Sequence, residues 1–179
     1  MLSTKDLVKV AMITTLIIIL GLIPAIPLGF VPVPIVLQNL GVMLAGLILG
    51  GKKGTLSILL FLVIGLFLPV FSGSRTTVPV LMGPSAGYVL AWLFVPLVFA
   101  FLYRSWLARY RSLAFLAIFI SGVLLVDLLG TIWLAVYTDM PLTRSLVASL
   151  VFIPGDTIKA VIATALAVSY KDSFLNTNS

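Results

Sequence analysis

The chain has 179 residues, and its composition is that of a membrane protein rather than a soluble domain. Hydrophobic residues make up 61% of it and charged residues 9%, whereas soluble domains average about 45–50% apolar and about 25% charged residues. With a formal net charge of +6, it has too few charges to cover a water-exposed surface, which excludes a cytosolic enzyme, a nucleic-acid-binding domain and a disordered tail. Six membrane helices of about 20 residues each would use about 120 residues and leave short loops.

Two residue types that carry much of protein chemistry are missing. The chain contains no Cys and no His, and its five acidic residues are all Asp. Disulfides, cysteine zinc clusters and Ser-His or Cys-His catalysis within the chain are therefore excluded. We expect no metal site, no cofactor and no enzymatic activity.

Apolar segments, taken in chain order, predict an all-α fold with six transmembrane helices in a single domain, 1–179. A loop with four prolines, Pro24–Pro34, follows the first segment, and a polar turn, Gly50–Gly54, separates the second from the third. A longer polar connection, Pro69–Pro84, precedes the fourth, and Pro154-Gly155 interrupts the sixth. The predicted spans are approximately residues 7–23, 35–50, 55–68, 85–103, 113–137 and 144–170.

Positive charges sort to one side of this arrangement. Of the eleven Lys and Arg residues, eight lie on the side of the two termini, two on the other side and one, Lys159, inside the sixth span. Because cytoplasmic loops carry the excess of Lys and Arg, we expect both termini in the cytoplasm of a multi-pass plasma-membrane protein. The eight are Lys5, Lys9, Lys52, Lys53, Arg104, Arg109, Arg111 and Lys171, and the two are Arg75 and Arg144.

Asp156 and Lys159 are the most informative residues of the sixth span. They are three residues apart and so share a helix face, and an ionisable side chain within a span costs several kcal/mol unless it is paired or hydrated. One interpretation is a structural pair that neutralises itself. We favour the other, a binding site that presents one acceptor and one donor to a polar ligand, because apolar residues would meet a purely structural need.

Other polar and aromatic residues are candidates for the same site. Gln38-Asn39 opens the second span with amide donors and acceptors, or is solvated at the interface. Tyr88 and Trp92 lie at i and i+4 in the fourth span, where they form an aromatic wall or belong to the aromatic belt of the membrane interface. Asp127, one turn before Thr131, is either hydrogen-bonded and structural or lines the cavity.

Small residues at intervals of four mark close helix contacts in the second and third spans. Gly46, Gly50 and Gly54 follow this spacing, which lets helix backbones approach closely in lipid. The contact is either internal packing or a partner surface.

Three motifs together resemble those of the BioY family, the biotin-specific substrate-binding (S) components of energy-coupling factor (ECF) transporters. They are Pro32-Val-Pro-Ile-Val-Leu-Gln38, Gly83-Pro-Ser-Ala-Gly-Tyr88 and Pro154-Gly-Asp-Thr-Ile-Lys159. The resemblance covers nearly the whole chain and implies a six-helix vitamin-binding protein with its site near the outer face. It also implies two kinds of partner, a transmembrane coupling protein and two cytoplasmic ATPases of the ABC type.

The resemblance suggests roles for individual residues. Asp156 would accept a ureido N–H of biotin, Lys159 would donate to the ureido carbonyl, and Tyr88 and Trp92 would pack on the rings. The tail carboxylate would meet Gln38, Asn39 or Arg75.

The chain also departs from the family pattern. It has Val36 where Thr is usual and Ser85-Ala86 where Thr-Gly is usual, and the loop that carries Arg75 is less glycine-rich. S components tend to carry Ala-x-x-x-Ala on the first helix for docking onto the coupling protein, and here Ala11 and Thr15 stand at that spacing.

Two functions of other classes remain as alternatives. One is an intramembrane aspartyl hydrolase that uses Asp127 and Asp156, and the other is a proton-coupled carrier of small solutes. A Lys three residues from Asp156 argues against both, because it favours the ionised carboxylate.

Overall fold

The computed structural model describes residues 2–103 and 111–176, and the described chain is helical, with two isolated bridges in its loops. The predicted all-α fold is confirmed for this part of the chain. Arg104 and Arg109, which contribute to the charge asymmetry, lie outside the described residues, as do the side chains of Arg111 and Lys171. The helices are α1 (Thr4–Leu22), α2 (Gln38–Leu44), α3 (Gly51–Ile64), α4 (Thr77–Leu81), α5 (Ala86–Trp92), α6 (Val95–Leu102), α7 (Arg111–Phe119), α8 (Leu125–Thr138), α9 (Leu142–Ser149) and α10 (Phe152–Asn176), with π-helical turns η1 (Ala45–Leu49) and η3 (Ile120–Leu124).

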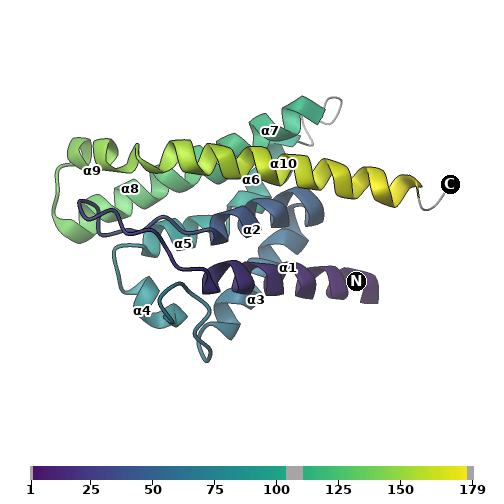
Figure 1. The fold of residues 1–179 in the computed structure, drawn as a ribbon, viewed down its shortest axis with the longest axis horizontal. Helices are drawn as coiled ribbons and strands as arrows, with labels where there is room; N and C mark the ends of the chain where they lie inside the picture. The colour runs from purple at the N-terminus through teal and green to yellow at the C-terminus, as the bar shows by residue number, and fades with distance from the viewer. Residues whose placement is uncertain (1, 104–110, 177–179) are drawn as a thin grey trace.

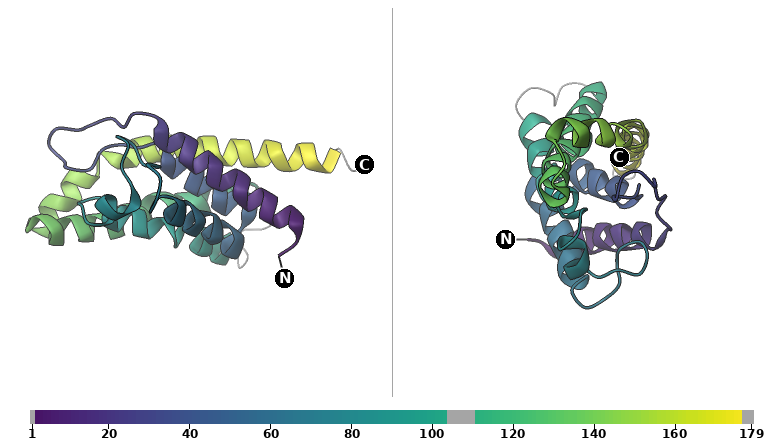
Figure 2. Two further views of the ribbon diagram at one scale, coloured as in Figure 1. Left: turned by 90° about the horizontal axis from the view of Figure 1, so that it is seen from below. Right: turned by 90° about the vertical axis from the view of Figure 1, so that its left-hand side faces the viewer.

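These helices form one bundle with both termini at the same end (Figures 1 and 2). Helix α2 lies against α1 and α10, α3 packs on α1 and α6, and α5 packs on α8. The loop that joins α1 to α2 lies at the opposite end from the termini, together with α4 and α9 (Figure 1). The loop between α1 and α2 and the connection from α3 to α5 thus lie at the end of the bundle opposite the termini.

Two of the helical segments are long and apolar enough to cross a membrane by themselves. They are Leu113–Thr138, which includes η3 and α8, and Phe152–Tyr170 of α10. A shorter apolar helix, Gln38–Leu49, lies between them and α1.

The fourth and sixth predicted segments are each made of two helices, and the breaks between these helices differ from the sequence prediction. Residues 85–103 were predicted as one span but form α5 and α6, because Pro96 lies in the first turn of α6. In the sixth segment, α9 ends at Ser149 and α10 begins at Phe152, so the break precedes Pro154. A proline in the first helical turn removes no intrahelical hydrogen bond, and Pro154 therefore begins a helix rather than interrupting one.

The N-terminal end of α1 is tied to the start of α3. Ser3 and Asp6 form a capping box, in which each side chain accepts a hydrogen bond from the other residue's backbone N–H. The Asp6 carboxylate also pairs with the Lys53 ammonium at 2.6 Å. The hydrogen bond from Lys53 lowers the pKa of Asp6.

Gly50 and Gly54 let the chain reverse within a very short distance. Gly50 has φ 75°, a conformation that favours glycine, and it alone forms the turn between η1 and α3. A Cβ at Gly54 would lie 2.7 Å from the carbonyl oxygen of Ala45 and 2.8 Å from Cβ of Pro96. The predicted close contact is therefore internal, between α3, η1 and α6.

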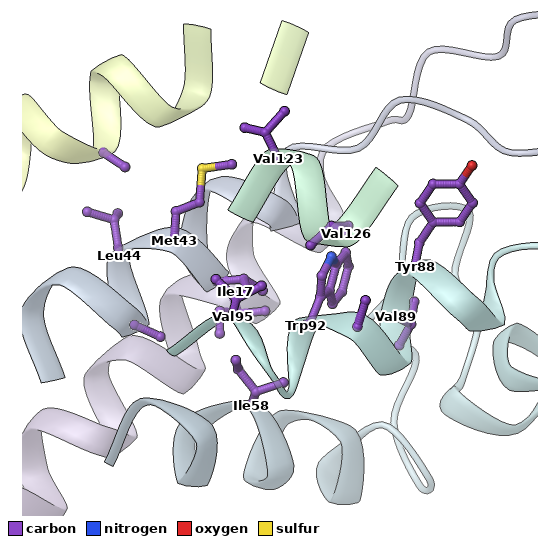
Figure 3. Close-up of a cluster of buried hydrophobic side chains, with 14 of the residues drawn as sticks. Ile17, Met43, Leu44, Ile58, Tyr88, Val89, Trp92, Val95, Val123 and Val126 are labelled. Carbon is purple, nitrogen blue, oxygen red and sulfur yellow. The ribbon is translucent and has the colours of Figure 1, made fainter. Parts of the chain in front are cut away.

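Buried apolar side chains fill the space between the helices. Figure 3 shows Trp92 and Val95 facing Ile17, Met43 and Ile58, which come from three other helical segments. All five are at most 3% exposed. The contributing helices also have apolar residues on their outer sides. Hydrophobicity alone therefore does not decide which side of a helix faces inward, and close packing between helices decides it.

We predict that Gly54→Ala destabilises the protein by about 1–3 kcal/mol, because the added methyl group has no room between Ala45 and Pro96. Gly46→Ala is the matched control, since its Cβ would have its nearest neighbour at 3.4 Å, an ordinary contact distance. Thermal unfolding of both variants in the same detergent measures the difference. Equal melting temperatures would contradict the close contact.

Candidate functional site

A cavity lies among the beginnings of α2, α8 and α10, one side of α5 and the two loops at the loop end of the bundle. Its volume is about 60 Å³. All seven of the binding residues predicted from the sequence line it, although they come from separate parts of the chain. They are Gln38, Asn39, Arg75, Tyr88, Trp92, Asp156 and Lys159.

The buried ion pair of α10 is the strongest polar feature of this cavity. The Lys159 ammonium lies 2.6 Å from Oδ1 of Asp156, and the two residues are 6% and 8% exposed. The same ammonium donates a hydrogen bond of 2.7 Å to the backbone carbonyl of Val36, just before α2. One ammonium therefore neutralises Asp156 and fixes the end of the loop that enters α2.

The two amide side chains at the start of α2 are anchored through their nitrogen atoms. Nε2 of Gln38 donates to the carbonyls of Ile17 and Val70, and Nδ2 of Asn39 donates to the carbonyl of Gly122 at 3.2 Å. Gly122 lies in the π-helical turn η3, where the regular i to i−4 pattern is interrupted. The oxygens of both amides, Oε1 and Oδ1, remain without a partner and are buried.

Tyr88 and Trp92 form part of the wall as the aromatic interpretation predicted, and the belt interpretation is wrong because both are buried. They are 8% and 3% exposed. The hydroxyl of Tyr88 points away from the apolar cluster (Figure 3) and lies 2.9 Å from Oγ of Ser149. Its ring meets Phe152 edge to face, with centroids 5.7 Å apart.

Several lining residues were not predicted from the sequence. Phe71, Ser85 and Phe152 line the cavity, and Ser85 makes no capping hydrogen bond to α5. Ser85 lies within the Gly83–Tyr88 motif and Phe152 lies two residues before the Pro154–Lys159 motif, which is the signal that was available. Asp127, left open by the sequence, lines the cavity as well, and no hydrogen bond links it to Thr131.

The two loops over the cavity are joined through one hydroxyl group. Ser72 accepts a hydrogen bond of 2.8 Å from the N–H of Ala25 and donates one of 3.2 Å to the carbonyl of Ile23. Ile26 and Ile35 exchange two backbone hydrogen bonds of 3.0 Å, which close the proline-rich loop on itself. The loops are thus held over the cavity by specific contacts.

Arg75 lies at the rim of the site. It is exposed, and its Nε donates to the carbonyl of Ser72 at 3.2 Å. It lines both the main cavity and a second hollow formed by the two loops, in which Pro34 also takes part. The guanidinium group is therefore placed between the cavity and the outside of the bundle.

Known proteins with similar sequences cover nearly the whole chain. A biotin transporter BioY of Lactococcus lactis subsp. cremoris is 43% identical over 168 residues, which span 92% of this chain and 89% of that protein. A biotin transporter BioY of Rhizobium etli is 40% identical over 172 residues, with 92% and 91% covered. A probable biotin transporter BioY of Bacillus subtilis is 38% identical, with 94% and 91% covered.

A solved structure shares the fold. The crystal structure of an S component for biotin from an ECF-type ABC transporter matches with a TM-score of 0.90 and 41% sequence identity. The match covers 94% of this chain and 91% of that chain.

Fold and site together define a membrane-embedded, helical protein of the S-component type, with a cavity that contains a buried ion pair at the loop end of its bundle. The BioY family model matches residues 1–176. The chain belongs to the BioY family.

Proposed function

We propose that this chain binds biotin as the S component of an ECF-type ABC transporter and captures it near the outer face of the cell membrane. The observation that carries the proposal is the buried Asp156–Lys159 pair at the wall of the cavity, in a chain whose relatives are named biotin transporters. A ureido group has two N–H donors and one carbonyl acceptor, so it matches a site that offers a carboxylate and an ammonium side by side.

The contacts of each side chain support an orientation for the ligand. Asp156 accepts an N–H of the ureido group, Lys159 donates to its carbonyl, and Tyr88 and Trp92 pack on the rings. Both N–H donors of the Gln38 amide already bind backbone carbonyls, and Asn39 gives one of its two to the carbonyl of Gly122, deep in the bundle. Arg75 at the rim therefore meets the carboxylate of the tail.

The membrane topology belongs to the proposal as well. Six spans with both termini in the cytoplasm of a multi-pass plasma-membrane protein agree with two features, the common end of the two termini (Figure 1) and the charge asymmetry of the sequence. In this orientation the loops over the cavity face outward.

Uptake against a gradient requires energy that this chain has no nucleotide motif to supply, so we place it with a transmembrane coupling protein and two cytoplasmic ATPases. Ala11 and Thr15 on α1 are the proposed docking residues, and both are exposed. The hydroxyl of Thr15 donates to the carbonyl of Ala11 at 2.9 Å. Its hydrogen-bonding need is met within the helix, which leaves a smooth face of small residues for a partner helix.

The hydrolase and carrier alternatives are not favoured. Both need a carboxyl group at position 156 that takes up a proton, and this group is held by the Lys159 ammonium at 2.6 Å. The relatives named above are transporters of biotin, not proteases.

We predict that Asp156→Asn and Lys159→Ala each weaken biotin binding at least tenfold, about 1.4 kcal/mol, because each removes one partner of the ligand and of the buried pair. Titration calorimetry on the purified, ligand-free chain measures this, with the exposed Lys52→Ala as a control of equal charge change. Binding of biotin by the parent protein tests the function itself. Parent-like affinity in both variants would contradict the site.

The proline-rich loop should act as a stiff cover. Replacing Pro32 and Pro34 by Gly enlarges the set of conformations that the free loop must give up on closure, so we expect weaker biotin binding. Replacing Pro141, which lies just before α9 and outside the cavity, is the control. Unchanged affinity in the double variant would show that the loop only connects α1 and α2.

Docking and ligand capture should separate, since they are placed at different parts of the bundle. Ala11→Trp should abolish uptake and co-purification with the coupling protein while biotin binding by the isolated chain persists, because the large side chain prevents close helix approach. Val136→Trp, at an exposed position on α8 and away from α1, is the control. Uptake assays in cells, pull-down and calorimetry give the three readouts. Concentrative uptake by the Ala11 variant would refute the docking surface.

A further inference from the structure

The cavity holds more hydrogen-bond acceptors than its own donors satisfy. Among the described residues that line it, the buried side-chain atoms without a partner are all oxygens. They are Oε1 of Gln38, Oδ1 of Asn39 and both carboxylate oxygens of Asp127. The site is therefore suited to a ligand whose buried end carries N–H donors.

Asp127 differs from the other carboxylate of the cavity in having no cation of its own. Asp156 has the Lys159 ammonium at 2.6 Å, whereas no hydrogen bond or ion pair reaches either oxygen of Asp127. Asp127 is 7% exposed. Leaving a buried carboxylate without a hydrogen bond is expensive, and natural proteins retain such groups mainly where they have a function.

The surroundings of Asp127 close it off from alternative partners. It also borders a second cavity between α8, α9 and the start of α10, where most of the lining is leucine and isoleucine. The polar neighbours there are Thr131 and Ser149, and the hydroxyl of Ser149 is engaged with Tyr88. No hydrogen bond joins Thr131 to Asp127, and the main cavity is the side from which the donors of a bound ligand can reach this carboxyl group.

We propose that Asp127 is a specificity-determining residue that accepts one N–H of the ligand, so that the two N–H groups of a ureido ring meet two carboxylates, Asp156 and Asp127. This assignment rests on the proposed function and deepens it. Lys159 neutralises Asp156, Asp127 adds a second acceptor in the deep part of the site, and Arg75 supplies a positive charge at the rim. A ligand with a donor-rich head and an anionic tail fits this polarity.

Thermal unfolding distinguishes this role from a structural one by the direction in which a substitution of Asp127 shifts the melting temperature. If Asp127 serves the ligand, Asp127→Asn replaces a buried carboxyl group that has no hydrogen-bond partner, so the melting temperature of the ligand-free protein should stay the same or rise. The stabilisation that biotin adds should fall, because affinity decreases at least tenfold. A lower melting temperature without ligand, or failure of the variant to fold, would instead show that the carboxylate supports the structure and would overturn the proposal.

Ligands with one blocked nitrogen give the sharper test. Two isomers of biotin, each methylated on one ureido nitrogen, are titrated against the parent and against Asp127→Asn. The loss caused by the substitution should vanish for the isomer whose methyl group replaces the hydrogen that Asp127 receives, and should persist for the other. Equal losses for biotin and both isomers would contradict a direct contact.

Thr131→Val is the matched control, because Thr131 lies one turn further along α8 and is also buried without a partner, yet it borders only the second of the two cavities. It should bind biotin like the parent. If the parent binds no biotin, the proposed function fails and this inference with it. If the parent binds biotin and Asp127→Asn binds it equally well, the proposed role of Asp127 is refuted while the proposed function stands.

Discussion

The ammonium group of Lys159 is the interaction on which the arrangement of the site depends. It lies inside a mostly apolar bundle, and it bonds both to the Asp156 carboxylate and to the carbonyl of Val36, 123 residues earlier in the chain. Removing one partner of a buried pair commonly costs about 3–5 kcal/mol, since the remaining charge is left uncompensated. The requirement to satisfy this cation therefore brings the start of α10 against the end of the proline-rich loop, and the cavity forms between them.

Backbone carbonyls complete the site, and they are available because the backbone is irregular at the loop end. Val36 precedes α2, Val70 follows α3, and Gly122 lies within a π-helical turn. Regular helices use their carbonyls internally, so segments that deviate from this pattern are where side chains can be anchored in an apolar environment. The loops and η3 thus orient Gln38, Asn39 and Lys159 as well as connecting helices.

The sequence predicted which residues line the cavity better than it predicted the divisions of the helices. Asp156 and Lys159 were found because charges inside an apolar segment are conspicuous, and Gln38 and Tyr88 because they adjoin proline and glycine motifs. The division of the fourth segment was missed since Pro96 lies in an otherwise uniform apolar stretch. The π-helical turns have no simple sequence signal. The lack of a partner for Asp127 depends on which side chains the fold brings near it, a long-range property that local patterns do not contain.

The hydroxyl of Ser72, which joins the two loops, also has a kinetic consequence. The cavity volume of about 60 Å³ is well below the roughly 300–1,000 Å³ of typical ligand pockets, so the lining, which includes the two loops, must move apart to make room for a vitamin-sized molecule. Separation breaks the hydrogen bonds from Ala25 and to Ile23. A ligand that enters and leaves by this step binds no faster than the free loops open, and it leaves no faster than the loops open around it. Its retention then depends on loop opening as well as on the contacts inside the cavity.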